Sequence, residues 1–296
     1  MRAAFQGIHG AYSEVACRKA LGAGCRTMPM QSFEDVFLAV QKGTADRGVI
    51  PIENSTAGSI HQNYDLLIAH KVHIVGEVYL RIEHALMCHP LASRKTVRDI
   101  RSHPQALAQC SKFFKSNRSL NAAPFFDTAG AAKSIIDENS LTVGAIASSL
   151  AAKLYGLRIL RRHVEDSANN FTRFLVIGRT PCTTAGAVRT KCSIAFRPVT
   201  NQPGILHAIL GAFALRGIDL LRIESRPDTR SPFEYLFSLD LAGHPRDKKI
   251  ANALADLQRM TGMYKLLGAY PMGKGKFYGG AREGVGFRSP FLNRKL

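Results

Sequence analysis

The chain has 296 residues, 46% of them hydrophobic, which is enough apolar material for two or three folded units. It contains no run of about 18 apolar residues, which excludes a membrane-spanning helix, and its polar N-terminal segment does not resemble a secretory signal. Forty basic against 22 acidic residues give a net charge of +18. We therefore expect a cytoplasmic protein with a strongly basic surface.

The positive charge does not identify a partner by itself. An excess of this size attracts nucleic acids, acidic membranes or small polyanions. The basic residues are spread along the whole chain, however, without the Lys/Arg block or interleaved aromatic residues of a nucleic-acid groove. This pattern favours a solvated surface, with no nucleic acid and no membrane as partner. The six cysteines are scattered without a CxxC pair, which is typical of reduced, buried thiols.

The N-terminal part alternates short apolar runs with helical patterns, the order typical of α/β proteins. A strand is predicted over residues 3–6, followed by a helix that Ser13 caps. A second helix is predicted to begin after Ser32 and to end at Gly43. The run RGVIPI then predicts a buried strand, which stops at the polar residues Glu53-Asn54-Ser55.

The next hundred residues predict a second α/β lobe inserted into the first. The run VHIVGEVYLRIEHALMCH is long enough to cross between lobes, and NFTRFLVIG predicts the returning strand. We place this lobe at about residues 76–170, within a catalytic domain of residues 1–180. His70 and His73 have HxxH spacing, but in a strand their rings would point to opposite faces. A metal site is therefore not favoured there.

The C-terminal part changes its pattern. Residues 181–190 are rich in Thr, Gly, Ala and Pro without apolar periodicity, which predicts a linker. Residues 191–271 then show the order βαββαβ, with an amphipathic first helix that Gly217 closes. Residues 272–296 form a Gly-rich, basic tail.

Several predicted strands end in a Ser, Thr, Asn or Asp that opens the next helix. Such junctions present free backbone N–H groups and the positive end of the helix dipole. If several converge on one cleft, they bind an anion without a metal. Ordinary helix capping explains any single junction better, so only their number points to function. The junctions are at Ser13, Asn54-Ser55-Thr56, Ser102-His103 and Asp127-Thr128.

Longer motifs then identify a family. PIENSTAGSI, SHPQALAQC, NFTRFLVIG and NQPGILHAILGAFALRGIDLLRIESRP resemble, in order and spacing, prephenate dehydratases with a C-terminal ACT domain. AFQGIHGAYSE and FEDVFLAVQKG resemble that family's opening segments, and the resemblance covers about residues 3–270. Ile8-His9 replaces the acidic residue and proline common there. No helical chorismate mutase region precedes the dehydratase, so a monofunctional enzyme is expected.

The resemblance implies a fold and an activity. The fold is an α/β, two-lobed catalytic domain like type 2 periplasmic binding proteins, followed by a βαββαβ ferredoxin-like ACT domain. Members convert prephenate to phenylpyruvate, water and carbon dioxide in phenylalanine biosynthesis, without metal or cofactor. L-Phenylalanine regulates them through the ACT domain. Because ACT domains pair between subunits, a homodimer or homotetramer is expected.

The resemblance also assigns site residues. The family's essential threonine falls on Thr172. Glu53 and Asn54 are expected to brace the lobes through hydrogen bonds to Ser102 and Gln109. The substrate-binding residues expected around them are Ser13, Ser55, Thr56, Arg173 and Phe174. The phenylalanine-binding residues of the ACT domain would be Pro203, Gly204, Ile205, Leu206, Glu224, Ser225, Arg226 and Pro227.

Two of these positions have a second interpretation. Strand alternation puts Arg173 on the opposite face from Thr172, so an ion pair within the fold explains it as well as a bond to a substrate carboxylate. His103 has the chemistry of an acid, but its place at a helix start favours a capping or packed side chain.

Three other functions stay open at this point. Arogenate dehydratase has the same chemistry on a substrate with an amine in place of the ketone, and no motif distinguishes the two. A non-catalytic amino-acid receptor would use the same lobes and ACT domain, although the NFTRF threonine argues against it. Nucleic-acid binding rests on net charge alone.

Overall fold

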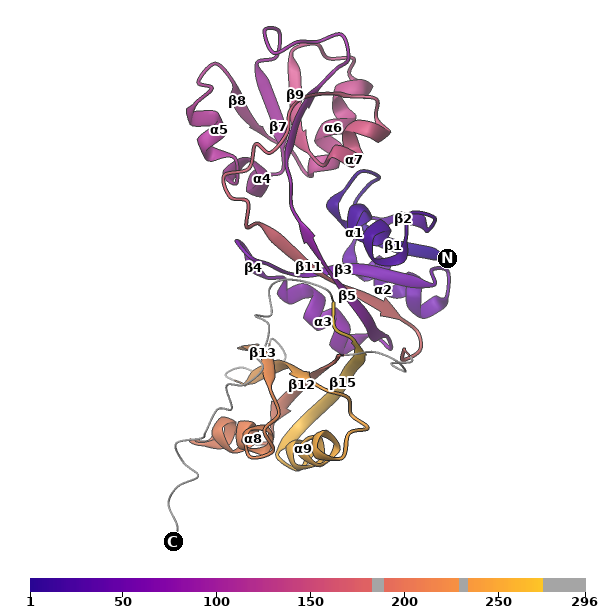
Figure 1. Ribbon diagram of the computed structural model, residues 1–296, viewed down its shortest axis with the longest axis vertical. Coiled ribbons are helices and arrows are strands. Elements are labelled where there is room, and N and C mark those ends of the chain that lie inside the picture. The colour runs from indigo at the N-terminus through magenta and orange to yellow at the C-terminus, as the bar shows by residue number, and fades with distance from the viewer. Residues whose placement is uncertain (183–188, 229–233, 274–296) are drawn as a thin grey trace.

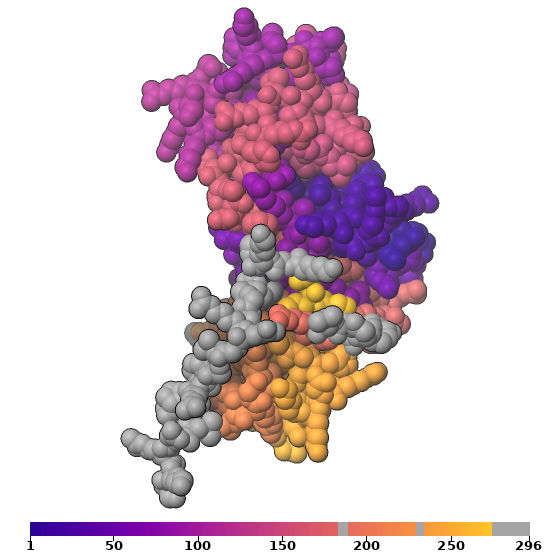
Figure 2. Space-filling view, in the orientation of Figure 1, coloured from indigo at the N-terminus to yellow at the C-terminus, as the bar shows by residue number. Residues whose placement is uncertain are grey.

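The computed structural model describes residues 1–182, 189–228 and 234–273, and in it the chain forms three units stacked along one long axis (Figure 1). The N-terminal lobe lies in the middle, with the second lobe on one side and the C-terminal unit on the other (Figure 2). Each unit is built on its own sheet. No helix within the described ranges is long and apolar enough to cross a bilayer. The predicted linker and tail lie largely outside the described residues.

The first lobe is a mixed sheet in the strand order β2-β1-β3-β11-β5, with the short β4 paired to β3. β1, β2 and β3 run parallel, and β11 enters antiparallel between β3 and β5. Helices cover both faces, so strands such as RGVIPIEN are apolar on both sides. The elements are β1 Arg2–Gln6, α1 Tyr12–Leu21, β2 Arg26–Met30, α2 Phe33–Lys42, β3 Arg47–Asn54, β4 Gly58–Ser59, α3 His61–Ala69, β5 His73–Arg81 and β11 Phe171–Gly178.

The ends of α1 and α2 depend on local side chains. In α2 the Ser32 hydroxyl accepts the N–H of Asp35, and Gly43 closes the helix in the left-handed conformation, as predicted. α1 differs, because Ala11 is its N-cap residue and Ser13 does not cap it. The Glu14 carboxylate instead accepts the backbone N–H of Gly10 at 2.7 Å. The helix therefore begins at Tyr12, one residue before Ser13.

The second lobe has the strand order β10-β6-β9-β7-β8. The chain crosses into it after β5, at Arg81, which is later than the predicted position near residue 76. The short strands β2 and β10 were not predicted, because neither RTMPM nor RILR shows a clear apolar alternation. The elements are β6 Ala85–Cys88, β7 Asp99–Ser102, α4 Pro104–Ala108, α5 Ser111–Lys115, β8 Asn121–Pro124, α6 Thr128–Asp137, β9 Val143–Ala147, α7 Ser149–Leu154 and β10 Arg158–Arg161.

The C-terminal unit has the predicted βαββαβ order and an antiparallel sheet, β13-β14-β12-β15. Its helices pack on one face of that sheet around Phe196 and Phe213. Residues of the other face, Leu267 and Tyr270, share a buried cluster with Ile74 of the first lobe, so the two units form one continuous core. The elements are β12 Thr190–Pro198, α8 Ile205–Ala214, β13 Leu220–Pro227, β14 Tyr235–Ala242, α9 Lys248–Arg259 and β15 Thr261–Pro271.

Candidate active site

A cavity of about 510 Å³ lies between the two lobes. Its walls come from the start of α1, the end of β3, β11, α4 with the residue that follows it, and the start of α6. The strand-to-helix junctions noted in the sequence therefore meet at one place. The predicted site residues that line the cavity are Ser13, Asn54, Gln109, Thr172 and Phe174.

A closed ring of hydrogen bonds connects the two lobes at the cavity wall. Asn54 Nδ2 donates to Asn170 Oδ1 (2.9 Å), and Asn170 Nδ2 donates to Gln109 Oε1 (3.0 Å). Gln109 Nε2 donates to Thr56 Oγ1 (3.0 Å), and Thr56 Oγ1 donates back to Asn54 Oδ1 (2.7 Å). These residues, called the amide ring below, bring together two strand ends and the end of α4. Thr56, predicted to bind substrate, does not line the cavity and instead holds the side chains of Asn54 and Gln109 in place.

Two backbone groups fix the direction of every bond in the amide ring. Asn54 Oδ1 accepts the N–H of Thr56 (3.0 Å) and of Ala57 (2.9 Å), and a backbone N–H can only donate. The other end of the Asn54 amide is therefore the donor that reaches Thr172 Oγ1 at 2.9 Å. Because the Thr172 oxygen accepts this bond, its own proton is free to point elsewhere. Thr172 is 7% exposed and faces the cavity.

Glu53 lies on the other face of the sheet. Glu53 pairs with Arg173 across the strands, whereas Asn54 pairs with Thr172, and successive residues of a strand point to opposite faces. Glu53 Oε2 lies 3.7 Å from Arg222 Nε of β13. The expectation that Glu53 braces the two lobes is corrected, because the alternation that puts Asn54 in the cavity turns Glu53 away from it.

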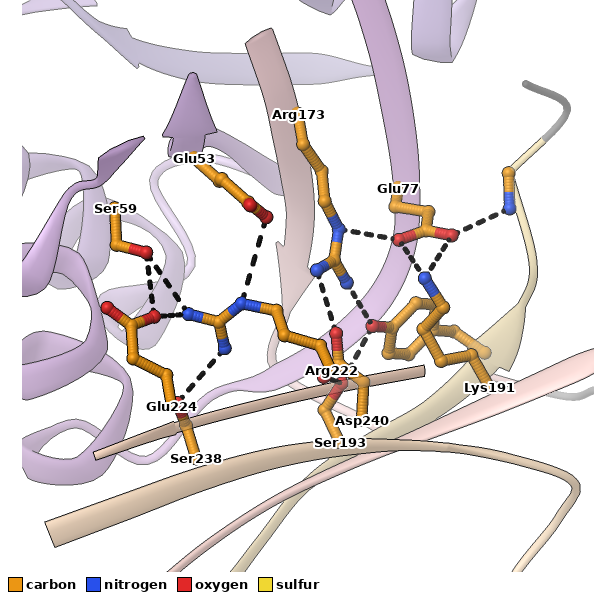
Figure 3. A network of polar contacts seen from close by, with 12 residues as sticks. Glu53, Ser59, Glu77, Arg173, Lys191, Ser193, Arg222, Glu224, Ser238 and Asp240 are labelled. Atoms are coloured by element: carbon orange, nitrogen blue, oxygen red, sulfur yellow. Dashed lines mark hydrogen bonds and ion pairs between the residues drawn. The ribbon is translucent and has the colours of Figure 1, made fainter. Parts of the chain in front are cut away.

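Arg173 belongs to a buried network between the first lobe and the C-terminal unit (Figure 3). Its Nε lies 2.9 Å from Glu77 of β5, and its Nη1 lies 2.7 Å from Asp240 of β14. Lys191, which is fully buried, also pairs with Glu77 at 2.9 Å. Burial raises the pKa of Asp240, but Arg173, Lys191 and the Ser193 hydroxyl outweigh it and hold that pKa below 3.8. The substrate-binding role given to Arg173 is thus corrected to an ion pair within the fold.

Two predicted serines also lie outside the cavity. Ser102 is fully buried, and its hydroxyl donates to the carbonyl of Ile146 at 2.6 Å, which ties β7 to β9. Ser55 donates to the carbonyl of Asn169 at 2.8 Å and accepts the N–H of Phe171 at 2.9 Å. Both hydroxyls satisfy backbone groups near the cavity, so the expected bond between Ser102 and the Glu53-Asn54 pair is corrected.

Other residues of the cavity wall and of the amide ring were not singled out as site residues from the sequence. Tyr12 and His84 line the cavity and lie 2.7 Å apart, and His84 also reaches Gln109 at 3.0 Å. Asn170 is 2% exposed and completes the amide ring. A lone histidine in an apolar run carries no spacing signal, whereas Asn170 could have been found from its place beside Thr172. His103 caps α4 by accepting the N–H of Gln105, as favoured from its position.

The predicted phenylalanine-binding residues divide between two places within one chain. Gly204, Ile205 and Leu206, which follow Pro203, line a cavity of about 330 Å³ at the start of α8. Glu224 and Arg226 instead face the first lobe, where Ser59 donates to Glu224 at 2.7 Å and Arg226 donates to Asp65 at 2.8 Å. Ser225 and Pro227 alternate with them along β13 and are exposed.

Gly10 holds the first lobe close to the second. Its φ is +92°, and an added Cβ would meet the backbone of Ala151 at 2.8 Å. We expect Gly10→Ala to lower the free energy of unfolding by about 1–3 kcal/mol and to reduce activity. Gly22→Ala is the matched control, since Gly22 has φ +89° with nothing within 4 Å. Urea denaturation and dehydration kinetics measure both effects, and a Gly10→Ala protein as stable and active as Gly22→Ala would contradict this account.

Comparisons with known proteins agree with this architecture. Residues 3–182 match the prephenate dehydratase family, and residues 199–259 match the ACT domain family. Arogenate dehydratase/prephenate dehydratase 1, chloroplastic, of Arabidopsis thaliana is 42% identical over 286 residues, covering 92% of this chain and 72% of that protein. Arogenate dehydratase 1 of Petunia hybrida is 42% identical over 288 residues, covering 92% and 67%.

Solved structures are similar over nearly the whole chain. Prephenate dehydratase of Arthrobacter aurescens in complex with L-Phe has a TM-score of 0.83 at 29% identity, covering 91% of this chain and 90% of that one. A structure described as GqqA, a novel type of quorum quenching acylase, has a TM-score of 0.84 at 38% identity, covering 92% and 98%.

The two-lobed α/β domain with an interlobe cavity, joined to a βαββαβ C-terminal unit, is that of a dehydratase, a class of lyase. The chain belongs to the prephenate dehydratase family and carries a C-terminal ACT domain. The fold class and the family predicted from the motifs are confirmed. No group of three His, Cys, Asp or Glu side chains suited to a metal occurs among the described residues.

Proposed function

We propose that the protein converts prephenate to phenylpyruvate, water and carbon dioxide at the interlobe cavity. The observation that carries this proposal is the direction of the bond from Asn54 Nδ2 to Thr172 Oγ1 at 2.9 Å. It leaves the Thr172 proton as a donor at the cavity wall. Asn54, Thr56, Gln109 and Asn170 form the support that holds this hydroxyl in place.

The cavity suits a dianion that must later lose charge. No lysine or arginine belongs to the described residues that line it. No ion pair with these residues therefore stabilises the substrate carboxylates in their charged form and opposes the loss of carbon dioxide. Ser13 and Thr128 lie in the first turns of α1 and α6, where backbone N–H groups and the helix dipole favour negative charge. Apolar groups such as Ile82 and Phe174 complete the wall.

The reaction needs little chemistry from the protein. The ring C–O bond breaks and its electron pair leaves with the oxygen, which gains a proton and departs as water. The bond to the ring carboxylate breaks at the same time, its electrons complete the aromatic ring, and carbon dioxide leaves. Thr172 hydrogen-bonds the departing oxygen and relays or orients the proton, because an alcohol is a poor acid by itself. Preorganised dipoles and a fixed geometry then supply most of the rate.

We further propose that L-phenylalanine regulates the enzyme through the ACT domain of a homodimer or homotetramer. The segment 204–206 lines its own cavity, while Glu224 and Arg226 on β13 contact the first lobe. A ligand that binds Glu224 or Arg226 would compete with their contacts to Ser59 and Asp65 and would therefore act directly on the catalytic domain. The expected coupling is about 1–3 kcal/mol. A related structure holds L-Phe, which supports this choice of ligand. The cytoplasmic location stays a prediction, since some relatives are named chloroplastic.

Purified protein tested on prephenate and on arogenate, with and without millimolar L-phenylalanine, checks both proposals. We expect phenylpyruvate absorbance from prephenate and a lower rate when phenylalanine is present. A higher kcat/KM on arogenate would transfer the proposal to arogenate dehydration, the reaction named for the plant relatives. Equal rates with and without phenylalanine would remove the regulatory proposal and leave the catalytic one in place.

A further inference from the structure

His84 lies where the two lobes and the amide ring meet. It follows β5, the strand by which the chain leaves the first lobe, and is 2% exposed. One ring nitrogen, Nε2, lies 3.0 Å from Gln109 Oε1, and the other, Nδ1, lies 2.7 Å from the hydroxyl of Tyr12 in α1. Tyr12 also packs edge-on against the imidazole, with ring centroids 5.5 Å apart. Each nitrogen therefore has a protein partner, and neither is free to act on a substrate.

The amide ring decides which nitrogen of His84 carries the proton. Thr56 Oγ1 donates to Asn54, so it accepts from Gln109 Nε2 and fixes the orientation of the Gln109 amide. Gln109 Oε1 is then an acceptor, which already receives the bond from Asn170 at 3.0 Å. A lone pair on His84 Nε2 would face another lone pair at this distance, so Nε2 must be the protonated nitrogen.

The neutral form of His84 then needs a donor at Nδ1, and Tyr12 supplies it. The Tyr12 hydroxyl also lies 2.8 Å from the carbonyl of Glu83, but it has one proton and cannot serve both acceptors. Burial lowers the pKa of His84 below 6.5, against smaller opposing effects of the Gln109 bond and of Glu165. At neutral pH the ring is therefore uncharged, and the Tyr12 proton points at Nδ1.

We propose that His84 is a positioning residue for the dehydration, which acts through Gln109 and the amide ring on the direction of the Thr172 hydroxyl. The Tyr12 hydroxyl bonds Nδ1 of this tautomer and holds the ring in place against Gln109. The bond from His84 Nε2 is a second donor to Gln109 Oε1 and strengthens the orientation that the amide ring sets, in which Asn54 is aimed at Thr172. This proposal rests on the proposed function, because it assigns a role in that reaction.

Nitrogen NMR of the ¹⁵N-histidine-labelled free protein tests the tautomer without any assay. The His84 signals are assigned as those missing from His84→Leu. We expect both the wild type and Tyr12→Phe to show a protonated Nε2 and an unprotonated Nδ1, because the amide ring sets the tautomer in both. A wild-type ring protonated at Nδ1 alone would overturn the proposal. Because no substrate is present, this result is independent of whether prephenate is the substrate.

Kinetics then test the role. We expect His84→Leu to lower kcat by about 10- to 100-fold, the usual cost of removing a group that orients a functional side chain, with KM changed much less. His84→Gln, whose amide keeps a donor toward Gln109, should recover part of the loss. Normal kcat in the folded His84→Leu protein would overturn the proposal. Absence of dehydration by the wild type would instead remove the proposed function.

Tyr155→Phe is the matched control for Tyr12→Phe. The Tyr155 hydroxyl also joins the two lobes, by donating to the carbonyl of His9 at 2.5 Å, but it has no contact with His84 or the amide ring. We expect Tyr12→Phe to lower kcat by about 10-fold and Tyr155→Phe to change it by less than about 2-fold. Equal losses in the two variants would show that only the contact between lobes matters, and would overturn the role given to Tyr12 in holding His84.

Discussion

Thr172→Val is expected to lower kcat by about 10²–10⁴, the usual cost of losing a well-placed proton contact, and to leave KM within a few-fold. Valine keeps the β-branched shape in β11 and removes only the hydroxyl that the cavity requires. The protein should stay folded, with a free energy of unfolding lower by about 1–3 kcal/mol, because one N–H of Asn54 Nδ2 loses its acceptor. Steady-state dehydration kinetics and a urea denaturation curve measure the two effects.

Two further variants separate the hydroxyl from the shape of the side chain. Thr172→Ser keeps the hydroxyl and should retain activity within about 10-fold of the wild type, since a serine oxygen still reaches Asn54. Thr172→Ala removes both the hydroxyl and the methyl group and should match Thr172→Val in kcat. A near-normal kcat in the Thr172→Val or Thr172→Ala enzyme would remove Thr172 from the mechanism.

Asp240→Asn is expected to lower the free energy of unfolding by about 3–5 kcal/mol. Asp240 is 5% exposed and faces Arg173 at 2.7 Å, so the substitution leaves a buried guanidinium with Glu77 as its remaining carboxylate. Glu77 is shared with Lys191 at 2.9 Å and cannot neutralise both cations. Urea denaturation at pH 7 measures the loss.

A double variant distinguishes net charge from packing. In Arg173→Met/Asp240→Leu one cation and one anion leave together, and Lys191 keeps Glu77 as its partner. We expect it to recover most of the stability lost in Asp240→Asn, because replacing a buried pair with apolar groups is often neutral. A double variant less stable than Asp240→Asn would show that the hydrogen bonds of the pair, including the one from Ser193 to Asp240, contribute more to stability than the balance of charge does.

The Asp240 contribution should also depend on pH. Its folded pKa lies below the ordinary value of 3.8, so the folded state binds a proton less readily than the unfolded chain. The stability that this group supplies is complete above the unfolded pKa and is lost as the pH falls through the folded one. Wild type and Asp240→Asn should therefore differ most near neutral pH and approach each other in acid.

The sequence by itself determined the family and the order of most elements, although it missed short strands such as β2 and β10. The N-cap at Ser32, the glycine end at Gly43 and the βαββαβ pattern depend on residues close together in the chain, where local geometry decides. The order of the motifs identified the prephenate dehydratase family, because motifs of contiguous residues can be read without knowing which residues are in contact. The expectation that Thr172 and Asn54 share a cleft also followed from the motifs.

Only the tertiary structure decided which neighbours of these residues work with them. Asn54 and Glu53 are adjacent, yet one enters the cavity and the other turns to Arg222, because the strand alternates. The same alternation separates Thr172 from Arg173. The amide ring joins Asn54 to Asn170 across 116 positions, and His84 reaches Tyr12 across 72. Such pairs depend on how β5 and β11 cross between the lobes, a packing that no local pattern in the sequence encodes.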